Sequence, residues 1–216
     1  MQRLSEDVVQ ALLDEMDRIV RDYPEGVQRT ALTVAELIQG TAVFPGGAGL
    51  WRGGSYFEPM PRYFPEAPIM FVGHNFDSIT GHDASRDRGG ELQSSGTFWN
   101  ILVGFLQRAD IVPTRCFFTN ALMGLKPGKA TGPMPSTSEY EEQCHQFLKR
   151  QIEIVAPFAI VALGGEARDR VRRCAPSIPW VHVMHPSARE FKPLVTRNER
   201  LVNVGTKIKG LLALNR

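Results

Sequence analysis

Four short apolar runs, each bounded by glycine, proline or polar residues, mark the second two-thirds of the chain. They read IMFVG (69–73), RCFFTN (115–120), FAIVALG (158–164) and WVHVMH (180–185). Nearly continuous apolar runs of this length are typical of strands that are buried on both faces. Between and after them, apolar residues recur at helical spacing over about 97–109, 138–154, 166–174 and 198–213. This alternation predicts an α/β fold in which helices cover both faces of a short parallel sheet of about four strands.

The first third of the chain has a different pattern. Residues 5–21 place apolar side chains at helical spacing with acidic residues between them, and Ser5 is a suitable N-cap. A second short helix is expected at about 30–39, which gives an N-terminal helical region over about 1–40. Residues 42–68 are rich in glycine, proline and aromatic residues, which favours a packed irregular segment over a linker. We therefore expect one domain over residues 1–216.

The composition is that of an ordinary globular domain. Hydrophobic residues make up 43% and charged residues 22% of the chain, which excludes disordered and fibrous classes. No apolar run approaches the roughly 20 residues of a membrane-spanning helix, and the N-terminal stretch, with acids among its apolar positions, is unlike a signal peptide. The cysteines, Cys116, Cys144 and Cys174, form no CxxC pair, so we expect no disulfide framework and no four-cysteine metal or cluster site. A reducing, cytoplasmic setting follows.

Positive charge gathers at the C-terminal end of the chain. Residues 186–216 contain seven basic and two acidic side chains, a local balance of +5, whereas the rest of the chain carries −3. Such an end can bind phosphates, although a solvated helix face would have the same composition.

Polar side chains follow three of the four predicted strands, in the segments GHNFD (73–77), TNAL (119–122) and HPS (185–187). In parallel sheets covered by helices, the working site lies beyond the carboxyl ends of the strands. These three segments are therefore the candidates for a functional site.

The same segments, in this order, resemble motifs of the uracil-DNA glycosylase superfamily. The resemblance covers about residues 68–190 and includes the FW pair that opens a helix at Phe98 and the ALG that ends a strand at Gly164. SGTFWNIL (95–102) looks like the helix of the mismatch-specific branch, and HPSAR (185–189) is closest to the single-strand-selective branch. Residues 138–167 are similar to a stretch of the iron–sulfur branch.

The resemblance implies a three-layer α/β/α sandwich and a monofunctional DNA glycosylase that removes uracil or a related deaminated base. By the family's motifs, Asn75 would position the attacking water, Asn120 would read the base and His185 would stabilise the leaving group. The remaining motif residues, Gly73, His74 and Phe76, together with Phe98, would line the base pocket. Bound DNA is the implied partner of a monomer without cofactor, and its contacts would come from four residues: Ser187, Arg189, Phe191 and Lys192. We expect Arg189 and Phe191 to wedge into the duplex.

The sequence also departs from the family's pattern. Phe76 replaces the proline of the first motif, and Asp77 follows it. Only Cys144 matches a cysteine of the iron–sulfur branch, so we expect no cluster. The segment GGELQSSG (89–96) lacks the aromatic residue on which the extruded base would stack, which leaves Phe76 as a possible platform, a different base selectivity, or a pocket that no longer binds uracil.

The residue types suit glycosidic bond cleavage, which leaves positive charge on the sugar and negative charge on the base. A hydrogen-bond donor such as His185 aimed at a uracil carbonyl oxygen stabilises this transition state. The Asn120 amide has one donor and one acceptor group and matches the edge of uracil but not that of cytosine. Asn75 is neutral and can orient a water without taking its proton, which leaves Asp77 as the hypothetical base.

The same residues also admit other interpretations. The histidine and asparagines could be structural, and Phe98 could be a core residue. Four potential metal ligands within ten residues, His74, Asp77, His82 and Asp83, would suit a metal-dependent hydrolase. A third alternative keeps the glycosylase fold without catalysis, as a protein that binds nucleic acid or a modified base.

Overall fold

The computed structural model describes residues 67–75, 78–87, 97–112, 115–128 and 134–214, together with Ser5, Asp7 and Asp14. The predicted N-terminal helical region and the segment 42–68 lie outside the described residues, except that Asp7 and Asp14 are helical. Phe76 and Asp77 also lie outside them.

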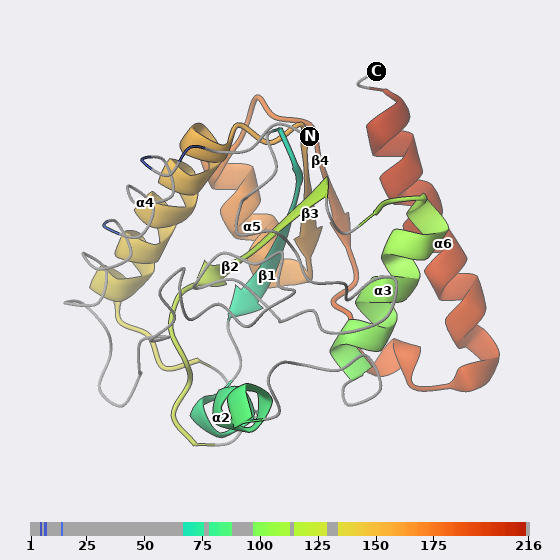
Figure 1. Cartoon of the computed structure of the whole chain (residues 1–216), viewed down its shortest axis with the longest axis horizontal. Helices are drawn as coiled ribbons and strands as arrows, with labels where there is room; N and C mark the ends of the chain where they lie inside the picture. Colours follow the sequence, from blue (N-terminus) through green and yellow to red (C-terminus); the bar gives the residue numbers. More distant parts are fainter. Residues whose placement is uncertain are drawn as a thin grey trace.

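The described strands form one parallel sheet with the order β2-β1-β3-β4 (Figure 1). They comprise β1 (Ile69–Asn75), β2 (Cys116–Leu122), β3 (Ala159–Leu163) and β4 (Trp180–Val183). Each corresponds to one of the four apolar runs, and the inner strands are buried on both faces because helices cover them. The expected parallel α/β fold is confirmed.

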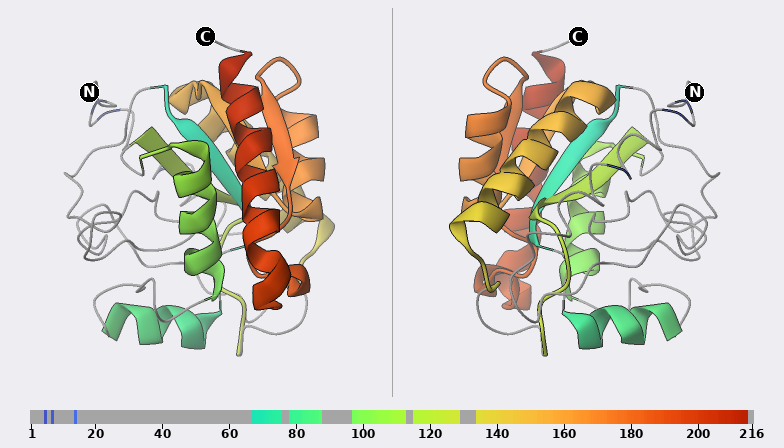
Figure 2. Two further views of the ribbon diagram at one scale, coloured as in Figure 1. Left: turned by 90° about the vertical axis from the view of Figure 1, so that its right-hand side faces the viewer. Right: turned by 90° about the vertical axis from the view of Figure 1, so that its left-hand side faces the viewer.

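Helices cover the sheet on both sides, as Figure 2 shows. On one face lie α3 (Thr97–Ala109) and α6 (Leu194–Ala213), and on the other lie α4 (Ser138–Val155) and α5 (Gly165–Cys174). Side chains of one strand alternate between the two cores, so that Phe118 packs with α3 and α6 while Phe117 packs with α4. The result is a three-layer α/β/α sandwich.

The helix boundaries follow local signals. Thr137 caps α4 by accepting a hydrogen bond from the Tyr140 N–H at 3.2 Å, and the helix ends where Ala156 adopts a left-handed conformation with φ of 44°. The sequence did not predict α2 (Ile79–Asp87), whose start is fixed by a hydrogen bond from the Gly81 N–H to Ser78 Oγ at 3.1 Å. It lies beyond the carboxyl end of β1 (Figure 1).

The strand order defines where a ligand can bind. The chain leaves β1 through α3 to reach β2 on one side, and returns through α4 on the opposite face to reach β3 on the other side. The ends of β1 and β3 therefore form a topological switch point, which in such folds opens a crevice at the carboxyl edge of the sheet. None of the helices in the described part of the chain is long and apolar enough to cross a membrane.

Candidate active site at the carboxyl ends of the strands

Two predicted site residues meet at the ends of neighbouring strands. Gly73 of β1 is paired in register with Asn120 of β2. A Cβ atom on residue 73 would lie 2.3 Å from Oδ1 of Asn120, so the amide lies directly against the glycine backbone. Asn120 is fully buried. Only glycine leaves room for this arrangement at position 73.

The residue before Asn120 anchors the strand from the opposite face. Thr119 Oγ1 donates a hydrogen bond of 2.7 Å to Oε1 of Gln151 on α4, and both side chains are fully buried. The end of β2 is therefore fixed by a polar contact in an otherwise apolar core.

His185 lies two residues beyond β4, beside the turn that follows β3. That turn contains Gly164, whose φ of 88° suits glycine and whose Cβ, if present, would lie 3.1 Å from Cβ of His185. The ring of Phe98, from the first turn of α3, packs against the imidazole with 5.4 Å between ring centroids. Three separate elements thus hold His185 at the carboxyl edge of the sheet.

The hydrogen bonding of His185 defines its protonation state. The Ser187 backbone N–H donates to Nδ1 of His185 at 3.2 Å, so Nδ1 is the acceptor. Burial lowers the pKa of His185 to about 4, and the neighbouring His74 lowers it further in the same direction. At neutral pH the ring is therefore uncharged, and its one proton lies on Nε2.

His74, at the end of β1, has a different environment. Burial lowers the pKa of His74, while Glu166 raises it and Arg170 and Lys126 lower it. Lys126 is buried, and its backbone carbonyl accepts a hydrogen bond of 2.9 Å from the N–H of Ile79 at the start of α2. Asn75 is half-buried at the last position of β1.

A comparison with protein families identifies the family. The model of the uracil DNA glycosylase superfamily matches residues 60–204, more than half of the chain. The chain belongs to the uracil-DNA glycosylase superfamily. No curated protein matches its sequence.

In this superfamily member four motif residues lie at one edge of the sheet. Gly73, Asn75, Asn120 and His185 all lie at the carboxyl edge of the one sheet, and Phe98 contacts His185. Phe76 and Asp77, the expected stacking platform and base, lie outside the described residues.

The segment after His185 corrects one prediction. Ser187, Arg189 and Lys192 are exposed, as DNA contacts must be. Phe191 is fully buried and packs against Phe105 of α3, with 5.6 Å between ring centroids. Phe191 is therefore a core residue, and the prediction that it wedges into a duplex is wrong, because its side chain fills the space between α3 and α6.

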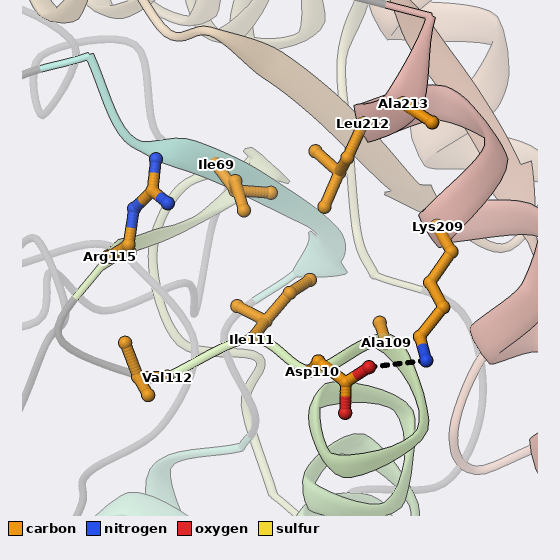
Figure 3. A pocket seen from close by; sticks show the side chains of 9 residues that line it. All are labelled: Ile69, Ala109, Asp110, Ile111, Val112, Arg115, Lys209, Leu212 and Ala213. Atoms are coloured by element: carbon orange, nitrogen blue, oxygen red, sulfur yellow. Dashed lines mark ion pairs between the residues drawn. The ribbon is translucent and has the colours of Figure 1, made fainter. Parts of the chain in front are cut away.

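The basic C-terminal end is only partly available to phosphates. Arg197 and Arg200 donate hydrogen bonds to main-chain carbonyls of residues 190–192, which sequence reasoning missed. Lys209 pairs with Asp110 beside a hollow of about 390 Å³ (Figure 3). This hollow borders Ile69 at the amino end of β1, and so lies at the edge of the sheet opposite to the candidate site.

Nothing in the described part of the chain suits a metal ion, since no three His, Cys, Asp or Glu side chains gather there. Asp77, from the proposed metal-ligand group, lies outside that part, and of His82 only the backbone is described. Cys144 Sγ accepts a hydrogen bond of 3.4 Å from the Met123 N–H, and burial raises the pKa of Cys144 to about 11.

Proposed function

We propose that the protein is a monofunctional DNA glycosylase, which hydrolyses the N-glycosidic bond of uracil or a related deaminated base in DNA. Membership in the uracil-DNA glycosylase superfamily supports the reaction class. The observation that carries the proposal is the hydrogen bond from the Ser187 N–H to Nδ1 of His185, which leaves Nε2 as the donor of the ring.

His185 would stabilise the departing base. As the bond between C1′ and N1 breaks, its electron pair moves into the base and gathers on a carbonyl oxygen. The Nε2–H of a neutral imidazole can donate to that oxygen, and in a poorly hydrated site this interaction strengthens as charge develops. Packing against Phe98 and Gly164 holds the ring in place before the base arrives.

Asn120 would select the base. Its amide can donate to a uracil O4 and accept from N3–H, and the exocyclic amine of cytosine mismatches this pattern. A site built this way disfavours the wrong base because its buried polar groups are left unpaired. Since Asn120 is fully buried, an extruded base must displace the groups that cover the amide.

Asn75 would orient the water that attacks C1′, and Asp77 would accept its proton and stabilise the sugar cation. The water oxygen forms the new bond to C1′, and the free base and an abasic site are the products. No lysine stands at a matching motif position to form a Schiff base, so we expect no strand cleavage. Ser187, Arg189 and Lys192 would contact the DNA backbone.

The experiment is incubation of the protein with single- and double-stranded oligonucleotides that contain uracil, hypoxanthine or xanthine, with chelator present and, in parallel, without it. The expected product is an abasic site that breaks only after alkali treatment and that is lost in Asn75→Ala. Full activity of Asp77→Asn would remove Asp77 from the mechanism. Activity that chelator abolishes would favour the metal-dependent alternative.

A second candidate function is recognition of nucleic acid or a modified base without catalysis. The complete burial of Asn120 and the replacement of the motif proline by Phe76 favour it. It predicts binding of oligonucleotides that weakens steeply with salt, and no abasic product.

A further inference from the structure

We propose that Arg197 and Arg200 are positioning residues, which brace the segment 187–192 so that it presents Ser187 and Arg189 to DNA and keeps His185 in its active tautomer. This inference rests on the proposed function for its effect on catalysis, while the brace itself can be measured without it.

Both arginines come from the first two turns of α6 and bind the main chain of the preceding segment. Arg197 Nε donates to the carbonyl of Phe191 at 2.7 Å, and Arg197 Nη2 donates to the carbonyl of Lys192 at 3.2 Å. Arg200 Nη1 donates to the carbonyl of Glu190. Three successive carbonyls thus receive guanidinium donors from one helix.

These carbonyls need external donors because of the local structure. The segment forms only a single 3-10 turn, η5 (Arg189–Phe191), in which the N–H groups of Phe191 and Lys192 bond back to residues 188 and 189. Such a short turn cannot satisfy its own last carbonyls, and Pro193, which has no N–H, separates it from α6. The arginines supply what the backbone lacks.

The braced segment is continuous with the proposed catalytic histidine. The Ala188 N–H donates to the carbonyl of His185 at 2.8 Å, and the Ser187 N–H donates to its Nδ1. Phe191 anchors the far end by its burial against Phe105. Movement of the segment would therefore shift the Ser187 N–H away from the imidazole. The ring would then no longer be held in the tautomer with its proton on Nε2.

This role differs from phosphate binding in its dependence on shape. The planar guanidinium of an arginine can donate to two carbonyls at once. A lysine ammonium keeps the positive charge but lacks this two-pronged geometry. Arg197→Lys therefore separates the two roles. Lys207, exposed on the same helix, serves as the control for loss of one positive charge.

The test compares Arg197→Gln, Arg197→Lys and Lys207→Gln with the unmodified protein. Amide hydrogen exchange at Phe191 and Lys192 should accelerate about tenfold or more in both Arg197 variants, because the turn opens more often, and should not change in Lys207→Gln. With a uracil-containing duplex, both Arg197 variants should lower kcat by about tenfold, since a small displacement of a catalytic group is costly.

Several results would overturn the brace. Exchange rates that stay unchanged in Arg197→Gln would contradict it, as would an Arg197→Lys variant that behaves like the unmodified protein. A rise in KM alone, shared by Lys207→Gln and reversed at low salt, would indicate phosphate contact instead. If Arg197→Gln does not fold, as judged by circular dichroism, Arg200→Lys takes its place with exchange at Phe191 as the readout.

Failure of the proposed function would look different. If the protein releases no base, while its Arg197 variants exchange faster and bind a fluorescent duplex more weakly, the bracing role is supported and the glycosylase activity is refuted. If the protein excises uracil, while hydrogen exchange is unaffected in every variant, the glycosylase activity is supported and the bracing role is refuted.

Discussion

The backbone N–H of Ser187 donates to Nδ1 of His185 at 3.2 Å and thereby assigns the ring's remaining proton to Nε2. A two-residue step in sequence, from a strand end into the following turn, is enough to fix the tautomer. The same turn keeps the half-buried ring beside Phe98. The position of the proposed hydrogen-bond donor, His185 Nε2–H, is thus set mainly by the local chain geometry.

The protonation of His185 is open to direct measurement. Its pKa in the folded protein, about 4, lies below the ordinary value of 6.5. Between these two pH values the unfolded chain binds a proton that the folded protein does not, so this group makes stability fall as pH drops from 6.5 toward 4. In long-range ¹H–¹⁵N NMR spectra, the His185 ring should show Nε2–H and no titration from pH 8 to about 5.

The peak of His185 is assigned by its loss in His185→Gln. A midpoint near the ordinary histidine value, or a proton found on Nδ1, would contradict the assigned state. Because His74 lowers the pKa of His185, His74→Ala should raise that midpoint.

The contact of Gly73 with Asn120 predicts a strong effect of one methyl group. In Gly73→Ala the new Cβ would lie 2.3 Å from Asn120 Oδ1, a separation that atoms cannot keep, so the amide must move. Base excision should fall by about tenfold to a hundredfold in kcat/KM. Gly210→Ala is the matched control, because its Cβ would meet nothing within 4 Å. Equal activity of the two variants would show that Asn120 does not read the base.

The buried pair of Thr119 and Gln151 predicts a coupled effect on stability. Thr119→Val removes the donor to Gln151 and should lower the free energy of unfolding by about 1–3 kcal/mol, measured in urea. Thr119→Ser keeps the hydroxyl and should lower the free energy of unfolding by less than Thr119→Val does. Within the described residues Nε2 of Gln151 has no hydrogen-bond partner, so Gln151→Leu should relieve part of the loss in the double variant. Strictly additive losses would refute the coupling.

The thiols should be inert in the folded protein. Burial raises the pKa of Cys144 and of Cys174 to about 11, and it raises the pKa of Cys116 well above its usual range. Since the thiolate is the reactive form, a thiol reagent at pH 8 should label none of them until guanidinium unfolds the chain. Rapid labelling of one thiol in the native protein would show that its surroundings open to solvent.

The sheet could be predicted from the sequence because each strand is a short apolar run bounded by glycine, proline or polar residues. Such a run is buried whichever strand or helix packs beside it. It missed α2, whose residues ITGHDASRD contain almost no apolar side chains and whose start depends on the Ser78 cap. The predicted start of the last helix, at about 198, is four residues late, because α6 begins at Leu194 after the breaker Pro193.

The candidate residues could be placed at one edge for a related reason, while their roles stay a prediction. Strand ends indicate which polar residues share an edge of the sheet, and Asn75, Asn120 and His185 do lie at the same edge. Sequence gives no means to see that Phe191, a single aromatic residue among charged ones, inserts between distant helices. Nor does it reveal that Arg197 and Arg200 bind main-chain carbonyls, because every residue has such a carbonyl and the sequence does not show which ones a side chain reaches.

Neutral His185 is proposed to promote release of the base. We would measure the single-turnover rate of uracil release from an oligonucleotide by the unmodified protein, His185→Ala and His182→Ala, the last of which alters a histidine within β4, the strand that precedes His185. We expect the rate to fall by about a hundredfold or more in His185→Ala and to change little in His182→Ala. Equal rates in all three proteins, or no release by any of them, would contradict it.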